Sequence, residues 1–172
     1  SANPDWPSMA LLRKRAEGLL WAEHRSNGAK DVAWVHEFTG NRPTSAKGKL
    51  AVARVLLAEG DREGAARLVR EAWRSEELSE ATEADAAGEF GDLLTRDDHR
   101  ARMDKRIGAK DLGAARRAAQ RLGSDYVAIV KACSAVRGKD DKASRALDDV
   151  PESARGDLGY TLCRLQWLLA QN

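Results

Sequence analysis

The residues with the most potential for chemistry lie near position 99, where one histidine stands among opposite charges. His99 follows Arg96 and Asp98 and precedes Arg100 and Arg102. A histidine that acts as a general base needs a nucleophile or a metal ion within hydrogen-bond reach, and the local spacing supplies neither. We therefore expect His99 to hydrogen-bond at a helix start. With Arg96, Arg100 and Arg102 it forms a set of candidate surface or ligand contacts.

Five tryptophans in a short chain raise the hypothesis of sugar stacking. Trp34 and Trp73 lie on apolar helical stripes, where packing between helices is the usual role of an indole ring. Trp6 lies outside any such stripe. We expect most of these rings in the core and keep Trp6 as a candidate contact residue.

Charged side chains are segregated along the middle of the chain. Residues 76–98 are mostly acidic, and residues 100–123 are mostly basic. One interpretation is a dipolar surface whose basic part touches an anionic polymer or a second domain. The favoured interpretation is two solvated helix faces that attract each other. Spacing alone nominates no acid/base pair among the carboxylates.

The two cysteines, Cys133 and Cys163, each lie among apolar residues of a predicted helix. This setting favours two buried free thiols, and a disulfide remains open if the chain is exported. No His/Cys cluster, glycine-rich phosphate loop or Ser-His-Asp pattern occurs in the sequence. We expect no catalytic residue, no cofactor and no metal site in this chain.

Composition limits the class of protein. The 172 residues are 42% hydrophobic and 33% charged, with a net charge of +2, which gives no general attraction to nucleic acid or to a membrane surface. Alanine is abundant while Val, Ile and Thr are scarce, a balance that favours helices over strands. The longest apolar runs fall short of the ~18 residues that a membrane span needs. The sequence predicts an all-α protein without a membrane span.

The apolar residues recur with helical periodicity and predict about ten short helices. An isolated piece of a helical array exposes the face that its next repeat would cover, and we expect this face to include Leu158, Trp167 or Leu168 of the last helix. The periodicity of the same helix places a leucine stripe inward. That stripe consists of Leu158, Leu162, Leu165 and Leu169. The ten helices begin at or just after Met9, Asp31, Ser45, Asp61, Ser79, Thr95, Asp111, Ser124, Asp140 and Ser153.

A glycine-aspartate turn recurs between these helices. Gly-Ala-Lys-Asp occurs at 28–31 and again at 108–111, and related turns stand at 60–61 and 138–140. Their glycines are 32, 48 and 30 residues apart, which indicates stacked helical hairpins with one extra helix. We predict an irregular, tetratricopeptide-like α-solenoid of antiparallel helices, a single superhelical domain over 1–172 with an extended leader at 1–7.

Four stretches carry a resemblance to one family: residues 4–9, 57–74, 93–104 and 147–151. Together they resemble the helical N-terminal region of soluble lytic murein transglycosylases, most closely the alphaproteobacterial kind. The most specific part is Leu-Thr-Arg-Asp-Asp-His at 94–99, followed by Arg102 and Asp104. The resemblance covers nearly the whole chain.

The resemblance implies a periplasmic protein that cleaves the glycan strands of peptidoglycan without water, leaving a 1,6-anhydro product. In that family an α-superhelix precedes a lysozyme-like domain, whose catalytic glutamate lies in a Glu-Ser motif followed by a Gly-Leu-Met-Gln motif. This pair of motifs does not occur here, so no catalytic residue is carried over. We expect a fragment that acts as a non-catalytic scaffold, with the catalytic domain of its parent protein and peptidoglycan glycan strands as partners.

A second hypothesis rests on the repeat alone, namely a stand-alone adaptor that binds another protein as tetratricopeptide arrays do. A third, an enzyme in its own right, is the least favoured because no constellation of residues meets the geometric requirements of a catalytic site.

Overall fold

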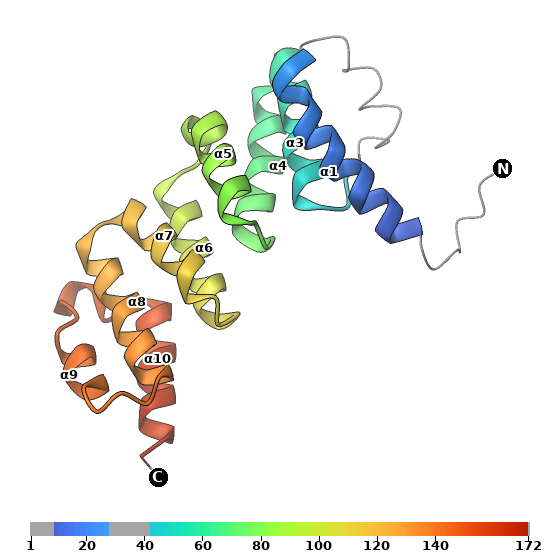
Figure 1. The fold of residues 1–172 in the computed structure, drawn as a ribbon. Helices are drawn as coiled ribbons and strands as arrows, with labels where there is room; N and C mark the ends of the chain where they lie inside the picture. The colour runs from blue at the N-terminus through green and yellow to red at the C-terminus, as the bar shows by residue number, and fades with distance from the viewer. Residues whose placement is uncertain (1–8, 28–41, 172) are drawn as a thin grey trace. The chain divides into compact units, whose positions relative to one another are not determined.

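The computed structural model of the chain describes residues 9–27 and 42–171, with the backbone alone for 23–27. This part contains nine α-helices and two short 3-10 turns and no strand, which confirms the all-α prediction (Figure 1). It divides into two compact units, one ending at Leu94 and the other beginning at Thr95. The expectation that residues 1–172 form one superhelical domain stays a prediction.

Unit 1 consists of α1 (Met9–Asn27), α3 (Ala46–Ala58), α4 (Arg62–Ser75), α5 (Glu80–Phe90) and the 3-10 turn η2 (Gly91–Leu93). Its helix starts follow the sequence signals. The side chains of Ser45, Asp61 and Ser79 accept hydrogen bonds from backbone N–H groups in the first turns of α3, α4 and α5.

The core of unit 1 forms around large side chains from four helices. Trp73 and Phe90 are fully buried, and Trp21 is 4% exposed. The Arg54 guanidinium lies 3.7 Å from the centroid of the Trp21 ring, and its Nη1 donates to the Trp21 carbonyl oxygen at 2.9 Å. The expected core role is therefore met for Trp21 and Trp73.

Unit 2 consists of α6 (Arg96–Gly108), α7 (Leu112–Leu122), α8 (Ser124–Arg137), α9 (Ala143–Asp148), the 3-10 turn η3 (Glu152–Ala154) and α10 (Leu158–Leu169). Helix α6 begins after Thr95, where the sequence predicts a helix start, and its first turn is closed by a capping box. Thr95 Oγ1 accepts from the N–H of Asp98, and Asp98 Oδ2 accepts from the N–H of Thr95 at 2.7 Å.

In the described part of the chain, three helix ends share one turn, in which a residue with positive φ directly precedes an aspartate. The φ angle is 87° at Gly60, 67° at Lys110 and 53° at Lys139. In each turn the aspartate N–H reaches back to the fifth residue before it, as in a Schellman motif. These bonds join Asp61 N to Leu56 O at 2.8 Å, Asp111 N to Arg106 O at 2.9 Å, and Asp140 N to Ala135 O at 3.0 Å.

The sequence assigns the exits of these helices to glycines, and among these three described turns the assignment is right only at Gly60. Gly108 is the last residue of α6, and Gly138 has a φ of −71°. The left-handed position is fixed by the aspartate that follows it, so in the second and third turns a lysine occupies it.

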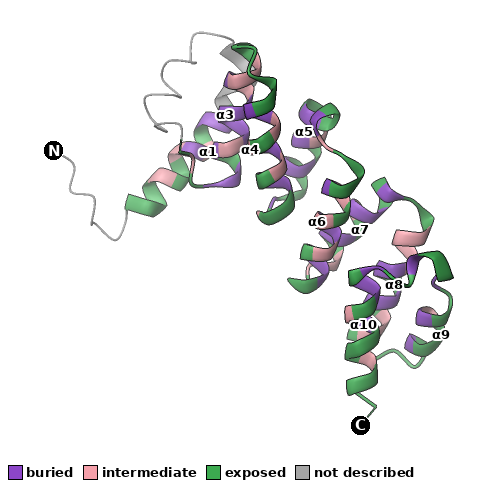
Figure 2. Cartoon of the chain, turned by 180° about the vertical axis from the view of Figure 1, so that it is seen from behind, coloured by how far each residue is buried: buried purple, intermediate pink, exposed green. Residues whose placement is uncertain are grey.

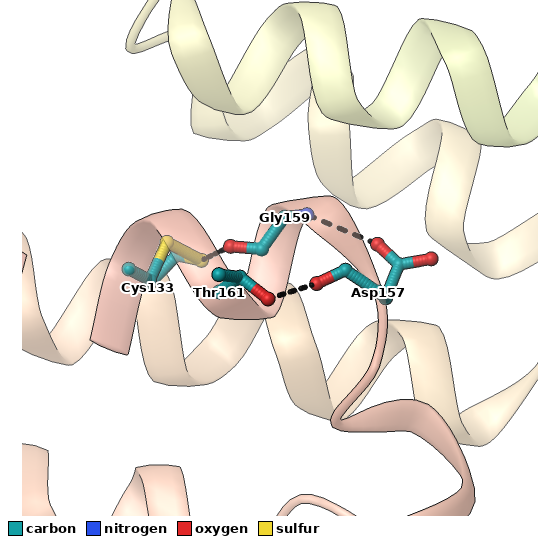
Figure 3. Close-up of a disulfide and its surroundings, with 5 residues drawn as sticks. Cys133, Asp157, Gly159 and Thr161 are labelled. Carbon is teal, nitrogen blue, oxygen red and sulfur yellow. Dashed lines mark hydrogen bonds between the residues drawn. A yellow bond between two sulfur atoms is a disulfide. The ribbon is translucent and has the colours of Figure 1, made fainter. Parts of the chain in front are cut away.

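Cys133 of α8 and Cys163 of α10 form a disulfide, with Cα atoms 5.2 Å apart (Figure 3). The expectation of two free thiols is therefore wrong. The two cysteines are 30 residues apart in sequence, and only the packing of α10 against α8 brings them together. The Cys133 sulfur also lies 3.6 Å from the Gly159 carbonyl oxygen, a close contact in which the sulfur carries no proton to donate.

The disulfide lies on the buried face of α10, and this is not the face that the leucine pattern predicts to be buried. Gly159, Tyr160 and Cys163 are buried against the core of unit 2, whereas Leu158 is 66% exposed. A Cβ on Gly159 would lie 2.8 Å from Cδ1 of Ile107, so this face approaches α6 closely. Figure 2 shows exposed residues along most of α10. The inward leucine stripe is therefore wrong, and α10 begins after Asp157 rather than at Ser153.

Several predictions lie outside the described residues. These are the leader at 1–7 with Trp6, the first Gly-Ala-Lys-Asp turn, and the short helix expected after Asp31. Among the described helices, none combines the length and the apolar character that crossing a membrane requires.

Candidate functional site

Helix α6 carries four of the five candidate contact residues, and the structure separates them by burial. Arg96 lies over the Tyr126 ring, 5.4 Å from its centroid, and Arg100 is directed at the start of α10. Arg102 is fully buried, which excludes it as a surface contact in this structure. His99 is half-buried near the start of α6, where hydrogen bonding at the helix start is its expected role.

Arg100 belongs to a cluster of ionisable groups. We call it the acid cluster, and its other members are Asp104 and Asp157. Arg100 Nε donates to Asp157 Oδ2 at 2.6 Å across 57 residues of sequence. The other oxygen, Asp157 Oδ1, accepts from the N–H of Gly159 at 3.0 Å and thereby caps α10 (Figure 3). Asp157 is only 3% exposed. The cluster therefore joins α6 to the first turn of α10.

Asp104 is the titratable member of the acid cluster. Burial, followed by the negative charge of Asp157 and a hydrogen bond with it, raises the pKa of Asp104 to about 7. Arg100 and the N–H of Gly159 oppose this shift without cancelling it. Two neighbouring carboxyl groups resist losing the last proton between them, so Asp104 is about half protonated at pH 7 and mostly protonated below it.

A carboxyl group with a pKa near 7 is suited to general acid chemistry at neutral pH. A general acid must also reach the atom that it protonates. Asp104 Oδ1 is shielded from solvent, and Asp157 is engaged by Arg100 and by the first turn of α10. The arrangement is therefore suited to holding α10 on α6, with a proton as part of the contact.

A largely apolar groove of about 730 Å³ lies beside the acid cluster, between α6 and the first two turns of α10. Asp104 and Lys105 supply its polar atoms. Small residues and leucines form the rest of its wall, namely Ala101, Gly108, Ala109, Leu158, Gly159 and Leu162. A groove of this size and composition fits an apolar side chain rather than a charged ligand.

Among the buried carboxylates of unit 1 is that of Glu17 on α1. Glu17 is fully buried, and its oxygens accept from the backbone N–H of Thr44 and of Ser45, both at 2.8 Å. The hydroxyls of the same two residues also donate to it. Burial raises the pKa of Glu17, but these four hydrogen bonds together lower it below its usual value. All of them serve the entry into α3, so the group is structural.

A hollow of about 690 Å³ lies beside this contact in unit 1, between α1, α3 and α5. Its cations are Lys14, Arg15 and Lys47, all of them exposed. Hydroxyl groups of Thr44, Ser45, Ser79 and Thr82 and the carboxylates of Glu76 and Glu77 complete the polar lining. Such a lining suits a hydroxyl-rich ligand that also carries negative charge.

Many of the charges that the sequence groups into an acidic segment are paired within unit 1. Lys49 Nζ lies 2.8 Å from Glu76 Oε1, and Arg62 Nη2 lies 2.6 Å from Asp92 Oδ2. Arg54 binds Glu89 through both guanidinium nitrogens that face it. These acidic side chains therefore find cations on α3 and α4.

Arg100 is a candidate contact residue from the sequence alone, whereas its partner, Asp157, is not. The local signal of Asp157 is that of a helix cap before Leu158 and Gly159, and nothing in the spacing connects it with Asp104. The dipeptide Glu152-Ser153 stands nearby in η3, exposed, and no Gly-Leu-Met-Gln follows it. It therefore does not reproduce the catalytic pair of motifs.

In the part of the chain that the structure describes, no three His, Cys, Asp or Glu side chains gather so as to hold a metal ion. Comparison with protein-family models, with curated proteins and with solved structures gives no match to this chain.

Proposed function

We propose that this chain is a non-catalytic, superhelical scaffold domain of a periplasmic peptidoglycan lytic transglycosylase. It positions the lysozyme-like catalytic domain of its parent protein and receives the glycan strand. The observation that carries the proposal is the segment at 94–104, whose sequence resembles that family. In unit 2 this segment opens α6 with a capping box and supplies Arg100 and Asp104 to the acid cluster.

The tetratricopeptide-like solenoid is part of this proposal. It is supported by two hairpins of one design, α3–α4 and α6–α7, in which the same turn is followed by an aspartate cap. Stacked hairpins with equivalent turns are the building unit of helical solenoids. The hairpins also share a packing face, because residues 50 apart on α4 and α7 occupy the same buried positions.

A periplasmic location is supported by the disulfide between Cys133 and Cys163. Disulfides persist in oxidising compartments and are rare in reducing ones. The pair is enclosed within the core of unit 2, where it links α8 and α10 permanently rather than as an exposed redox couple.

The glycan strand is proposed to lie on unit 1, at the hollow between α1, α3 and α5. Peptidoglycan offers sugar hydroxyls together with carboxylates, and the hollow offers the carboxylates of Glu76 and Glu77 together with the cations Lys14, Arg15 and Lys47. A lining that mixes hydrogen-bonding groups with cations recognises both features of such a polymer.

Sedimentation with purified peptidoglycan tests the glycan-binding part of the proposal. The chain should pellet with the insoluble polymer, and Lys14→Glu with Lys47→Glu should reduce the pelleted fraction at least fivefold. Lys131→Glu with Lys142→Glu is the matched control, because it changes two exposed lysines of unit 2. An equal loss of the pelleted fraction in both double variants would show that the chain binds peptidoglycan by nonspecific charge attraction.

The non-catalytic part is tested in the same samples by analysing the soluble products. We expect no 1,6-anhydro-muropeptides from this chain alone, and their release would overturn the proposal. The gene beyond the codon for Asn172 should encode a lysozyme-like domain with a Glu-Ser motif. A reading frame that stops there would favour the stand-alone adaptor, for which the groove between α6 and α10 is the natural binding surface.

A further inference from the structure

The outward face of α10 carries four leucines with the spacing of a coiled-coil seam. Leu158, Leu162, Leu165 and Leu169, here called the leucine seam, are separated by four, three and four residues. This is the d-a-d-a order of a heptad pattern. Leu158, Leu165 and Leu169 are 66%, 52% and 67% exposed, and Leu162 is half-buried. Three of the four leucines of the seam therefore face water.

The seam is shaped differently at its two ends. Beside Leu158 lies the groove of about 730 Å³, whose lining includes the small residues Ala101, Gly108 and Ala109. At the other end Leu169 protrudes. The two ends are about 16 Å apart at 1.5 Å per residue. A hollow and a protrusion thus stand on one helix at opposite ends.

The flanks of the seam carry no charge that would oppose pairing of two equal helices. The positions beside it are Thr161, Gln166 and Leu168. The nearest basic residue of the helix, Arg164, is exposed, lies outside these flanking positions and donates to the Tyr160 hydroxyl at 3.2 Å. Charged flanks normally set partner choice in helix pairs, and uncharged flanks leave it to shape.

From these three features we propose that the leucine seam is a dimerisation surface, on which α10 pairs in antiparallel orientation with α10 of a second copy of this chain. The spacing of four, three and four residues is symmetric about its centre. A twofold axis that passes between Leu162 and Leu165 therefore places Leu162 of each copy opposite Leu165 of the other copy. The same axis brings Leu169 of the second copy to the groove beside Leu158. This isologous pairing uses one patch twice, and it does not rest on the proposed function.

The dimer is expected to be weak. A single pair of 12-residue helices buries less surface than the about 1,200 Å² at the lower end of stable interfaces, so we expect a dissociation constant on the order of 10 µM. The exchange between monomer and dimer should therefore be visible within the usual concentration range of sedimentation experiments.

Sedimentation velocity of the 172-residue chain across a concentration series tests the pairing. The chain should pass from monomer to dimer and stop there. Leu165→Glu should weaken the association at least tenfold, because it places a carboxylate at the centre of the seam. Leu19→Glu is the matched control, a leucine of α1 that is 60% exposed, and it should leave the association unchanged.

A chain that stays monomeric at all concentrations would overturn the proposal, as would larger assemblies of variable size. Assemblies of variable size would mean that the leucine seam associates nonspecifically, as an apolar face does when another helix of the same polypeptide normally covers it. An equal response of both glutamate variants would also overturn it. Circular dichroism of each variant, with the helical signal of the native chain, shows that the fold is retained.

Disulfide trapping tests the orientation. Leu158→Cys and Leu169→Cys, each oxidised alone, should give little covalent dimer, whereas their equimolar mixture should give a heterodimer. Covalent dimers from the single variants would show a parallel pair and overturn the antiparallel arrangement. The native cysteines stay engaged in their own disulfide during the experiment.

Discussion

The hairpins α3–α4 and α6–α7 share one local design but are held in place by different chemistry. Each has the same Schellman turn and an aspartate cap, and the buried positions on α4 recur 50 residues later on α7. Outside the hairpin, unit 1 uses the carboxylate of Glu17, fully hydrogen-bonded to the entry of α3. Unit 2 uses a disulfide and an acid cluster in which the pKa of Asp104 is raised to about 7.

The difference shows that a repeated hairpin does not fix how its neighbours attach. The hairpin is encoded by residues close in sequence, so it can be copied as a unit. The attachments join residues 27 to 57 positions apart, and each unit solves them separately. Changes in the attachments should therefore affect one unit at a time, whereas changes in the turns should affect the two hairpins alike.

The largest effect is expected from removing the disulfide. Cys133→Ser with Cys163→Ser should lower the free energy of unfolding by about 3 kcal/mol, because it reopens a loop of 30 residues in the unfolded chain. Hydrogen exchange should rise in α8 and α10 and stay unchanged in α3 and α4. Reduction of the native protein is the control and should act in the same way. Equal loosening of both units would contradict their separate attachment.

Glu17→Gln should lower the free energy of unfolding by about 2 kcal/mol. The carboxylate accepts four hydrogen bonds from N–H and O–H groups of Thr44 and Ser45, and the side-chain NH2 group of Gln cannot accept them. The pKa of Glu17 is lowered in the folded state, so its contribution is present above the unfolded value of 4.5 and is lost as pH falls through the folded value. Urea unfolding at pH 7 and pH 3 should show the difference from the native chain shrinking at the lower pH.

Asp104→Asn should change the free energy of unfolding by a smaller amount, and at alkaline pH it should raise it. The folded-state pKa of about 7 lies above the unfolded value of 3.8, so stability from the neutral acid is complete below pH 3.8 and is lost as pH rises to about 7. An amide stays neutral, and the variant should be more stable than the native chain by about 1 kcal/mol at pH 8, a figure reduced for partial exposure. Urea unfolding should show no gain at pH 4, and a constant gain at both pH values would contradict the shared proton.

The smallest effects are expected in the turns. Lys110→Gly should stabilise the chain by about 0.5–1 kcal/mol, because glycine adopts a φ of 67° without the steric cost that lysine meets. Gly60→Ala, the matched change in the other hairpin, should destabilise it by a similar amount. Thermal unfolding of both variants checks the pair, and an unchanged midpoint for both would show that the turns do not limit stability.

Most of the local structure could be predicted from the sequence. The helix class, the caps at Ser45, Asp61, Ser79 and Asp111, and the capping box at Thr95 follow from side chains within three residues of the groups that they satisfy. The left-handed lysines could not be predicted from composition, since glycine is the usual occupant of that position.

Of the candidate site, the sequence located Arg100 and its charged neighbours but not the partner that gives them a role. Asp157 lies 57 residues from Arg100, and no periodic pattern connects them. The burial of Arg102 was also invisible, because a charged residue is buried only when tertiary packing encloses it.

The sequence by itself determined the helices, their caps and the recurrence of one hairpin, because these depend on hydrogen bonds and periodicity within a few residues. Only the tertiary structure decided which face of α10 is buried. The pattern of four leucines favours one face, but the link between Cys133 and Cys163 and the close approach of Gly159 to Ile107 select another. A covalent bond and a steric fit between distant segments outweigh the hydrophobic periodicity of one short helix, and they leave its leucines facing outward.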